Sequence, residues 1–310
     1  MGAVERTGAT RWRALLLAAV LFLATVGCGG TSSSASGGGK LPVVAAEDFW
    51  GNLASQLGGD RVQVTSLITS PDTDPHDYEP TAQDARTIAS ARYVVFNGLG
   101  YDSWAAQAID ANPVDHRRVL EVGRLLGLHD GDNPHRWYFP ADVERVIAQI
   151  TADYKALDPA SAGYFDQQLQ NLETNGLKTY KELLAQIEQG YAGTPIGASE
   201  SIVEGLAQAT QLDLRTPAGY LSAISQGTDP TAHDKTAVDA QIAQHLIKVF
   251  VYNRQNATPD VQALVDAATA AGIPVIAITE TLTPEGASFE EWQSGQLHEL
   301  LDALAKASTS

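Results

Sequence analysis

Two histidines stand in proline-bounded loops that suit metal coordination. His76 lies in the segment Pro75–Pro80, after an apolar run at 62–68 and a turn-rich gap at 70–74. Proline fixes its own φ and pushes the preceding residue toward extended geometry, so an imidazole held there loses little conformational freedom on binding. His135 repeats the pattern in Asn133-Pro134-His135-Arg136-Trp137. One such histidine is equally compatible with a solvated surface loop, but the repetition favours two nitrogen ligands for a metal ion.

Two glutamates follow apolar runs in the second half of the chain. Glu200 comes after the run 194–198, and Glu280 comes after the run 273–278. Parallel sheets bind ligands beyond the carboxyl ends of their strands, and both glutamates occupy that kind of position. We therefore expect His76, His135, Glu200 and Glu280 to form one metal site, with two ligands from each half of the chain.

The donor set limits the choice of ion. Two imidazoles and two carboxylates make a mixed nitrogen and oxygen shell, which suits Mn²⁺, Zn²⁺ or Fe²⁺ and differs from the thiolate-rich shell of structural zinc. The hard oxygen donors favour Mn²⁺, whereas the general order of affinities favours Zn²⁺. The sequence therefore predicts one divalent transition metal ion, Zn²⁺ or Mn²⁺ with Fe²⁺ less favoured, and does not choose between the first two.

Each predicted ligand has a simpler alternative. Glu200 could cap the helix that follows it, because carboxylates are favoured at helix N-termini. Glu280 could be a solvated loop acid. His129, next to Asp130, could form an accessory site near His135. The remaining histidines lie in acidic or loop-like stretches and are expected at the surface, namely His116, His233, His245 and His298.

The elements that must position these residues alternate between strand and helix, which indicates parallel βαβ units. In the first half we expect strands at 41–45, 62–68 and 93–96 and helices at 49–57, 81–91 and 103–111, with Thr81 as an N-cap. After a helix at 140–157 the pattern restarts, with strands at 194–198, 249–252 and 273–278 and helices at 202–210, 259–271 and 289–305.

Between the two halves, apolar residues continue at near-helical spacing from Asp158-Pro159 to Gly190. A helix of about 30 residues would span about 45 Å, enough to cross between two domains. Asn175-Gly176 is a weak point where this helix could kink or break. The sequence thus predicts an N-terminal α/β lobe at 40–158, a linking helix at 159–190 and a C-terminal α/β lobe at 191–310.

The first forty residues are typical of an export signal. A positive segment, Arg11-Trp12-Arg13, precedes an apolar run at 14–26 that is too short for a confident membrane span. The run ends at Thr25-Val26-Gly27-Cys28, which resembles a bacterial lipobox despite Thr25 in place of the usual Leu. Residues 28–39 are rich in Gly and Ser and suit a flexible tether. We predict a signal peptide at 1–27 and a lipid anchor to the cell membrane at Cys28; a plain signal peptide with an incidental cysteine is the alternative.

Composition argues against a nucleic-acid-binding protein and against a fold held by disulfides. The chain has 310 residues, 44% of them hydrophobic, which is ample for two globular domains. A net charge of −17 argues against a nucleic-acid partner, because phosphate neutralisation needs clustered Lys and Arg. Cys28 is the single cysteine, so no intrachain disulfide can form.

Several motifs follow one another along the chain, namely Gly59–Val62 with Asp74–Thr81, Asn97–Trp104, Asn133–Trp137, Ser199-Glu200 and Thr279–Leu282. In this order they resemble the motifs of one family, the manganese and zinc ABC-transporter solute-binding proteins (cluster A-I). The resemblance covers essentially all of 40–310. Two departures stand out. Glu280 occupies a position where Asp is commoner in the family, and the His-rich loop of many zinc importers is missing.

The resemblance implies an α/β fold with two (β/α)₄-like lobes of parallel sheet, a long rigid linking helix and the metal site in the cleft between the lobes. It also implies an extracytoplasmic lipoprotein that captures the ion and delivers it to an ABC permease with its ATPase, without catalysing a reaction. We expect a monomer. A metalloenzyme would need an open coordination position, and no H-E-x-x-H or G-x-S-x-G motif is present. A surface adhesin or interaction lipoprotein with a structural metal site stays as the alternative function.

Overall fold

The computed structural model describes residues 39–70 and 78–309. The predicted signal peptide, Cys28 and the tether lie outside the described residues, and so does His76. Within the described ranges, no helix is both long and apolar enough to cross a membrane. Residues 40–310 form one compact unit.

The first lobe is built on a four-stranded parallel sheet with the strand order β2-β1-β3-β4. Its strands are β1 (Leu41–Glu47), β2 (Val62–Ile68), β3 (Tyr93–Phe96) and β4 (Arg118–Glu121). Val43 of β1 is in register with Val64 of β2 and Tyr93 of β3. The central strands are near-continuous apolar runs, as expected for a parallel sheet covered on both faces.

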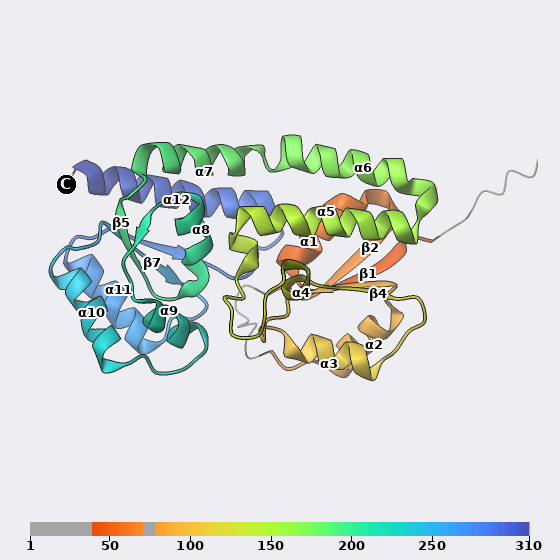
Figure 1. The fold of residues 1–310 in the computed structure, drawn as a ribbon, viewed down its shortest axis with the longest axis horizontal. Helices are drawn as coiled ribbons and strands as arrows, with labels where there is room; N and C mark the ends of the chain where they lie inside the picture. Colours follow the sequence, from red (N-terminus) through yellow and green to blue (C-terminus); the bar gives the residue numbers. More distant parts are fainter. Residues whose placement is uncertain (1–38, 71–77, 310) are drawn as a thin grey trace, which may run out of the picture. The chain divides into compact units, whose positions relative to one another are not determined.

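Helices cover the two faces of this sheet (Figure 1). One face packs on α1 (Asp48–Gly58) and α5 (Pro140–Leu157), and the other packs on α2 (Ala82–Ser90) and α3 (Ser103–Ala111). Alternate residues of one strand serve the two faces, with Val43 on the first and Val44 on the second. Thr81 caps α2 as predicted, in a reciprocal capping box with Asp84.

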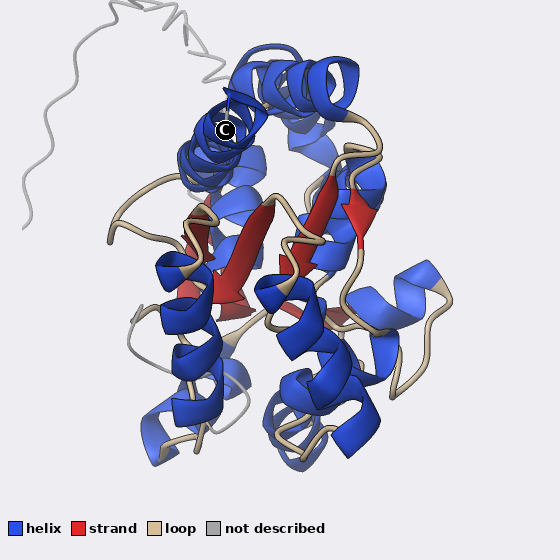
Figure 2. Cartoon of the chain, turned by 90° about the vertical axis from the view of Figure 1, so that its left-hand side faces the viewer, coloured by secondary structure: helices blue, strands red, loops and turns tan. Residues whose placement is uncertain are grey.

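The second lobe repeats this topology. Its parallel sheet has the order β6-β5-β7-β8, with β5 (Pro195–Ala198), β6 (Asp213–Leu214), β7 (Val249–Asn253) and β8 (Val275–Ile278). The strands lie between two layers of helices in Figure 2. One layer is α9 (Ala218–Ser225), α10 (Ala232–Ala243) and α11 (Pro259–Ala270). The other includes α8 (Glu204–Ala209) and α12 (Phe289–Thr309). The two parallel α/β lobes agree with the predicted fold class.

The segment 159–190 is interrupted rather than one continuous helix. A 3₁₀ turn (Pro159–Ser161) leads into α6 (Ala162–Asn171), a π-helical turn spans Leu172–Gly176, and α7 (Lys178–Tyr191) follows. The π turn contains the weak point Asn175-Gly176, where glycine lowers helix stability. α6 packs on α5 and α1 of the first lobe, while α7 packs on α12 of the second (Figure 1).

A polar seam on α1 joins the lobes. Asp48, Asn52 and Gln56 are four residues apart, so their side chains share one face of the helix. Asp48 Oδ2 accepts a hydrogen bond from Leu282 N at 3.2 Å, and Asn52 Oδ1 accepts one from Phe289 N at 3.0 Å. Gln56 Nε2 donates to Glu290 Oε2 at 2.8 Å. Each partner belongs to the second lobe, so α1 holds that lobe at three points.

Several elements have no clear pattern in the sequence. β4 is one of them, because its first two residues are exposed and its ends are charged, as is common in a short edge strand. β6 has only two residues. α4 (Val122–Leu126) is one short turn, and α9 and α10 fall in a stretch where small and polar residues blur the helical period. Each lobe therefore contains more strands and helices than the apolar pattern of the sequence predicts.

Candidate metal centre

Three of the four predicted ligands lie together in the structure. His135, Glu200 and Glu280 each offer a ligand atom within 4.8 Å of the others. Their side chains are 0 to 1% exposed. His135 Nε2 and Glu200 Oε1 are 3.9 Å apart. The fourth predicted ligand, His76, falls in the undescribed residues 71–77, so it remains a prediction.

His135 is oriented by the loop that carries it. It precedes a 3₁₀ turn (Arg136–Tyr138) that leads into α5. Asn133 Oδ1 accepts hydrogen bonds from both the backbone N and the ring Nδ1 of His135, at 2.9 Å each. Because Nδ1 donates its proton to this amide oxygen, Nε2 is the nitrogen that carries a lone pair toward Glu200. This arrangement fixes the tautomer that a metal ion requires.

Glu200 stands between β5 and the 3₁₀ turn Ser201–Val203. Its backbone is extended, and its side chain makes no capping hydrogen bond to the following turn. Instead, Oε1 accepts from Asn253 Nδ2 at 2.8 Å and Oε2 accepts from Asn256 Nδ2 at 2.9 Å. The capping alternative therefore does not describe this side chain, which points its carboxylate toward His135.

Glu280 follows β8 by two residues and is 1% exposed, so it is not a solvated loop acid. Its Oε2 accepts from Tyr101 Oη at 2.7 Å, across the interface between lobes. Burial raises the pKa of Tyr101 well above its ordinary value, so the phenol stays a donor. Oε1 of Glu280 accepts from Asn253 Nδ2 at 2.6 Å.

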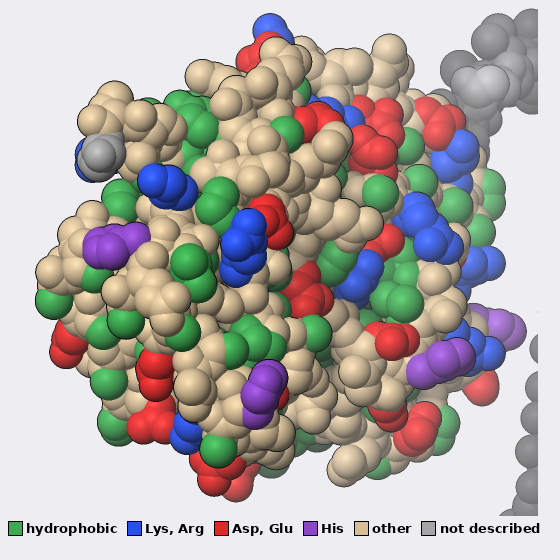
Figure 3. Space-filling model, turned by 60° about the vertical axis from the view of Figure 1, so that its left-hand side comes forward, with side chains coloured by type: hydrophobic (Ala, Val, Ile, Leu, Met, Phe, Trp, Pro, Cys, Tyr) green, Lys and Arg blue, Asp and Glu red, His purple; other side chains and the backbone are tan. Residues whose placement is uncertain are grey.

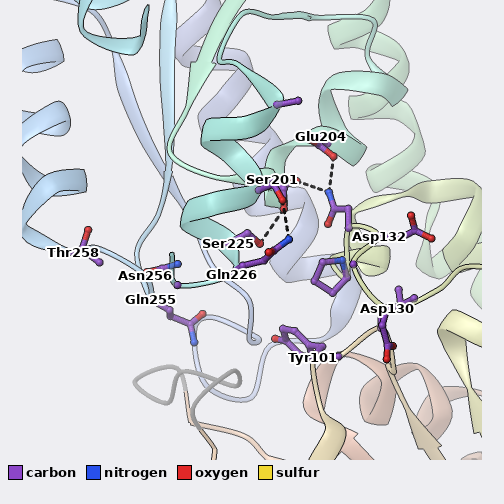
Figure 4. Close-up of a pocket in the computed structure, with 18 of the residues that line it drawn as sticks. Tyr101, Asp130, Asp132, Ser201, Glu204, Ser225, Gln226, Gln255, Asn256 and Thr258 are labelled. Atoms are coloured by element: carbon purple, nitrogen blue, oxygen red, sulfur yellow. Dashed lines mark hydrogen bonds between the residues drawn. The ribbon is translucent and has the colours of Figure 1, made fainter. Parts of the chain in front are cut away.

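A cleft of about 1020 Å³ borders this cluster, with walls from both lobes (Figure 4). Several of its lining residues are also hydrogen-bond partners of the ligands: Tyr101, Ser201 and Asn256. Its remaining polar lining includes Asp130, Asp132, Glu204, Gln226 and Thr258. No Lys or Arg is among the described residues that line the cleft, so it favours cations over anions.

The other histidines lie on the surface, where Figure 3 shows histidine side chains among interspersed acidic and basic groups. His129 is exposed and does not belong to the described cluster of ligand atoms. The remaining four are exposed as well, namely His116, His233, His245 and His298. Their position agrees with the sequence interpretation.

A second group of buried carboxyls lies in the first lobe. Glu47, the last residue of β1, is 0% exposed, and burial together with the neighbouring Asp102 raises its pKa well above the usual range. Burial raises the pKa of Asp102 to about 6, although its carboxylate accepts from Asn97 N at 2.6 Å and Gly98 N at 2.7 Å. The raised pKa favours the protonated form of Glu47, which can donate a hydrogen bond to Asp102. No local pattern indicates this pair, because its members are 55 positions apart in the sequence.

Two parallel α/β lobes bring one buried imidazole and two buried carboxylates together at the boundary between them. Residues 43–303 match the model of a family described as zinc-uptake complex component A, periplasmic. The chain belongs to this family, whose members are binding components of transport systems rather than enzymes.

Individual relatives show how far the similarity extends. The High-affinity zinc uptake system protein ZnuA of Bacillus subtilis is 25% identical over 318 residues, which cover 92% of each chain. The Manganese-binding lipoprotein MntA of Halalkalibacterium halodurans is 28% identical over 165 residues, 50% of this chain and 55% of that protein. The periplasmic zinc binding protein TROA from Treponema pallidum has a similar fold, with a TM-score of 0.69 and 19% identity over 87% of this chain and 99% of that chain.

Proposed function

We propose that this protein is an extracytoplasmic solute-binding lipoprotein that captures one divalent transition metal ion and delivers it to an ABC permease with its ATPase. The observation that carries the proposal is the convergence of His135 from the first lobe with Glu200 and Glu280 from the second. With His76 as the fourth ligand, protein groups fill the shell. Such a shell suits capture of an ion rather than activation of a bound water, which needs an open position.

The rest of the chain fits this role. Residues 1–27 direct export, Cys28 carries the lipid, and residues 28–39 let the 40–310 unit stand off the membrane as a monomer. The segment 159–190 links the lobes at 40–158 and 191–310. Relatives named for manganese and for zinc both match the chain, in keeping with a donor set that serves either ion. No specific observation favours the adhesin alternative.

Metal titration tests the proposal. Protein purified from its host is analysed for bound elements, then stripped and titrated with Mn²⁺ and Zn²⁺. We expect one equivalent of ion, with an affinity that falls in acid because the imidazole ligands must be deprotonated.

The matched variants are His135→Ala and His129→Ala, which remove a buried and an exposed histidine six positions apart. His135→Ala should lower the affinity by more than about 100-fold, a loss larger than that for residues outside the ligand shell. His129→Ala should bind as the wild type does. A wild type without bound metal, or equal binding by both variants, would refute the proposed site.

A further inference from the structure

The strand order places one side chain between the two carboxylate ligands. β7 lies between β5 and β8 in the sheet, Glu200 follows β5 and Glu280 follows β8. Asn253 is the last residue of β7 and is 0% exposed. Its Nδ2 donates to Glu200 Oε1 at 2.8 Å and to Glu280 Oε1 at 2.6 Å. One amide nitrogen therefore uses both of its hydrogens on the two ligands.

Two neighbours of Asn253 complete the arrangement. Gln255 Oε1 accepts from Glu280 N at 2.6 Å and from Thr281 N at 3.1 Å, which anchors the backbone at Glu280. Asn256 Nδ2 donates to the second oxygen of Glu200. We call Asn253, Gln255 and Asn256 the amide bracket. Together with Tyr101, it gives every carboxylate oxygen of the two glutamates a hydrogen-bond donor.

Asn253 is itself held in place. Its Oδ1 accepts from Gln255 N at 3.0 Å, and its backbone N donates to Ser199 Oγ at 3.1 Å. A flipped amide would turn Oδ1 toward two carboxylates, oxygen against oxygen. The orientation with Nδ2 on the ligands is therefore the one the surroundings select.

The hydrogen bonds of the amide bracket, rather than the bound ion, set how both carboxylate groups are rotated. A carboxylate oxygen can accept more than one bond, so these hydrogen bonds do not prevent coordination. Zn²⁺ has no geometric preference of its own from d-electrons and is satisfied by one oxygen from each carboxylate. Mn²⁺ favours more oxygen donors and binds intrinsically more weakly, so it depends more on how the carboxylates are presented.

We propose that the amide bracket sets the ratio of Zn²⁺ to Mn²⁺ affinity, with Asn253 as its principal positioning residue. The proposal rests on the function proposed above. When the bracket is weakened, the carboxylates follow the ion, and the selectivity moves toward the intrinsic order that favours Zn²⁺.

The test compares the dissociation constants of both ions for the stripped full-length protein and for Asn253→Ala, by competition titration. We expect the Mn²⁺ affinity to fall about 10–100-fold, the usual cost of losing a group that orients a ligand. The Zn²⁺ affinity should fall less, so that the ratio of Zn²⁺ to Mn²⁺ affinity rises at least about threefold. The spectrum of bound Mn²⁺ in electron paramagnetic resonance should broaden as its oxygen shell loses order.

Gln241→Ala is the matched control. Gln241 is a buried amide of the same lobe, and its Nε2 donates to Arg215 O at 2.7 Å. Its loss should lower stability and leave the affinity ratio unchanged. Should Asn253→Ala not fold, Asn256→Ala at the cleft removes a single donor from Glu200 and should shift the ratio in the same direction by a smaller factor.

The outcomes separate this proposal from the proposed function. Equal losses for both ions in Asn253→Ala, or in Asn256→Ala where the first does not fold, would reduce the bracket to structural support and overturn the proposal. A wild type that binds neither ion would instead overturn the proposed function.

Discussion

Each lobe has a buried asparagine at the end of its third strand, and the two asparagines hold the predicted metal ligands in different ways. Asn97 follows β3 and Asn253 ends β7, the equivalent strand, and both are 0% exposed. Asn97 Nδ2 donates to Pro134 O at 2.9 Å, beside His135, while its Oδ1 accepts from Trp50 Nε1 at 3.1 Å. Asn97 therefore fixes the backbone of a ligand loop, whereas Asn253 contacts the ligand side chains themselves.

The buried carboxyl groups near the strand ends also have different hydrogen-bond partners in the two lobes. In the first lobe, burial raises the pKa of both Glu47 and Asp102, and the charge of Asp102 raises the pKa of Glu47 further, so the pair favours holding a proton. In the second lobe, an amide stands between Glu200 and Glu280 and donates to both. The contrast shows that a shared topology does not determine the chemistry at its edge. We expect the donor between Glu200 and Glu280 to keep both carboxylates ionised and able to bind a metal ion.

The largest loss of metal affinity should come from removing the negative charge of Glu280 in the second lobe. Glu280→Gln keeps the shape of the side chain and replaces one carboxylate oxygen by an NH₂ group. We expect metal affinity to drop by more than about 100-fold, beyond the cost of changing a group outside the shell. Isothermal titration measures the loss. Glu280→Asp, the commoner residue in the family, should keep part of the affinity. Wild-type binding by Glu280→Gln would show that Glu280 is not a ligand.

A smaller effect is expected from the asparagine of the first lobe. Asn97→Ala releases the loop before His135 and leaves a buried indole without its acceptor, at a cost of about 1–3 kcal/mol in the free energy of unfolding. Metal affinity should fall about tenfold, by a similar factor for both ions, because His135 is the predicted nitrogen ligand for either ion. Urea denaturation and competition titration check the two parts. A changed ratio of Zn²⁺ to Mn²⁺ affinity in Asn97→Ala would contradict the expectation that only Asn253 affects this ratio.

The smallest effect concerns the proton held in the first lobe. The folded pKa of Glu47 is raised, so the folded protein keeps a proton that the unfolded chain loses above its ordinary carboxyl pKa of about 4.3. This pair's contribution to stability is therefore present in acid and declines as pH rises toward the folded pKa.

In Glu47→Gln, an amide can donate to Asp102 at every pH. As pH rises from about 5 toward neutrality, the variant should gain stability relative to wild type, because only the wild type must keep a buried proton that its unfolded chain has lost. Urea denaturation of stripped protein across this range provides the measurement. A constant difference between the two proteins would show that Glu47 has the same protonation in the folded and unfolded states, and so that its folded pKa is not raised.

The sequence predicts the parts of this site that depend on local pattern. β1, β2 and β3 are recognisable as apolar runs, and Glu200 and Glu280 are recognisable because each follows one. The amide bracket leaves a faint local sign, several amides directly after an apolar strand at 253–256. Its role could not be inferred, because that requires the order in which β5, β7 and β8 lie side by side. Strand order is fixed by packing of the whole lobe rather than by neighbouring residues. The place of His76 remains a prediction.

The polar seam on α1 affects how the bound ion could be released. When a ligand drives closure of a hinged protein, the ligand's preference for the closed form is what moves the equilibrium. Asp48, Asn52 and Gln56 tie the lobes at points that carry none of the predicted ligands. Because these hydrogen bonds do not involve the predicted ligands, we expect them to oppose separation of the lobes with or without a bound ion. We therefore expect loading to require little domain motion, and release to require that these hydrogen bonds be broken.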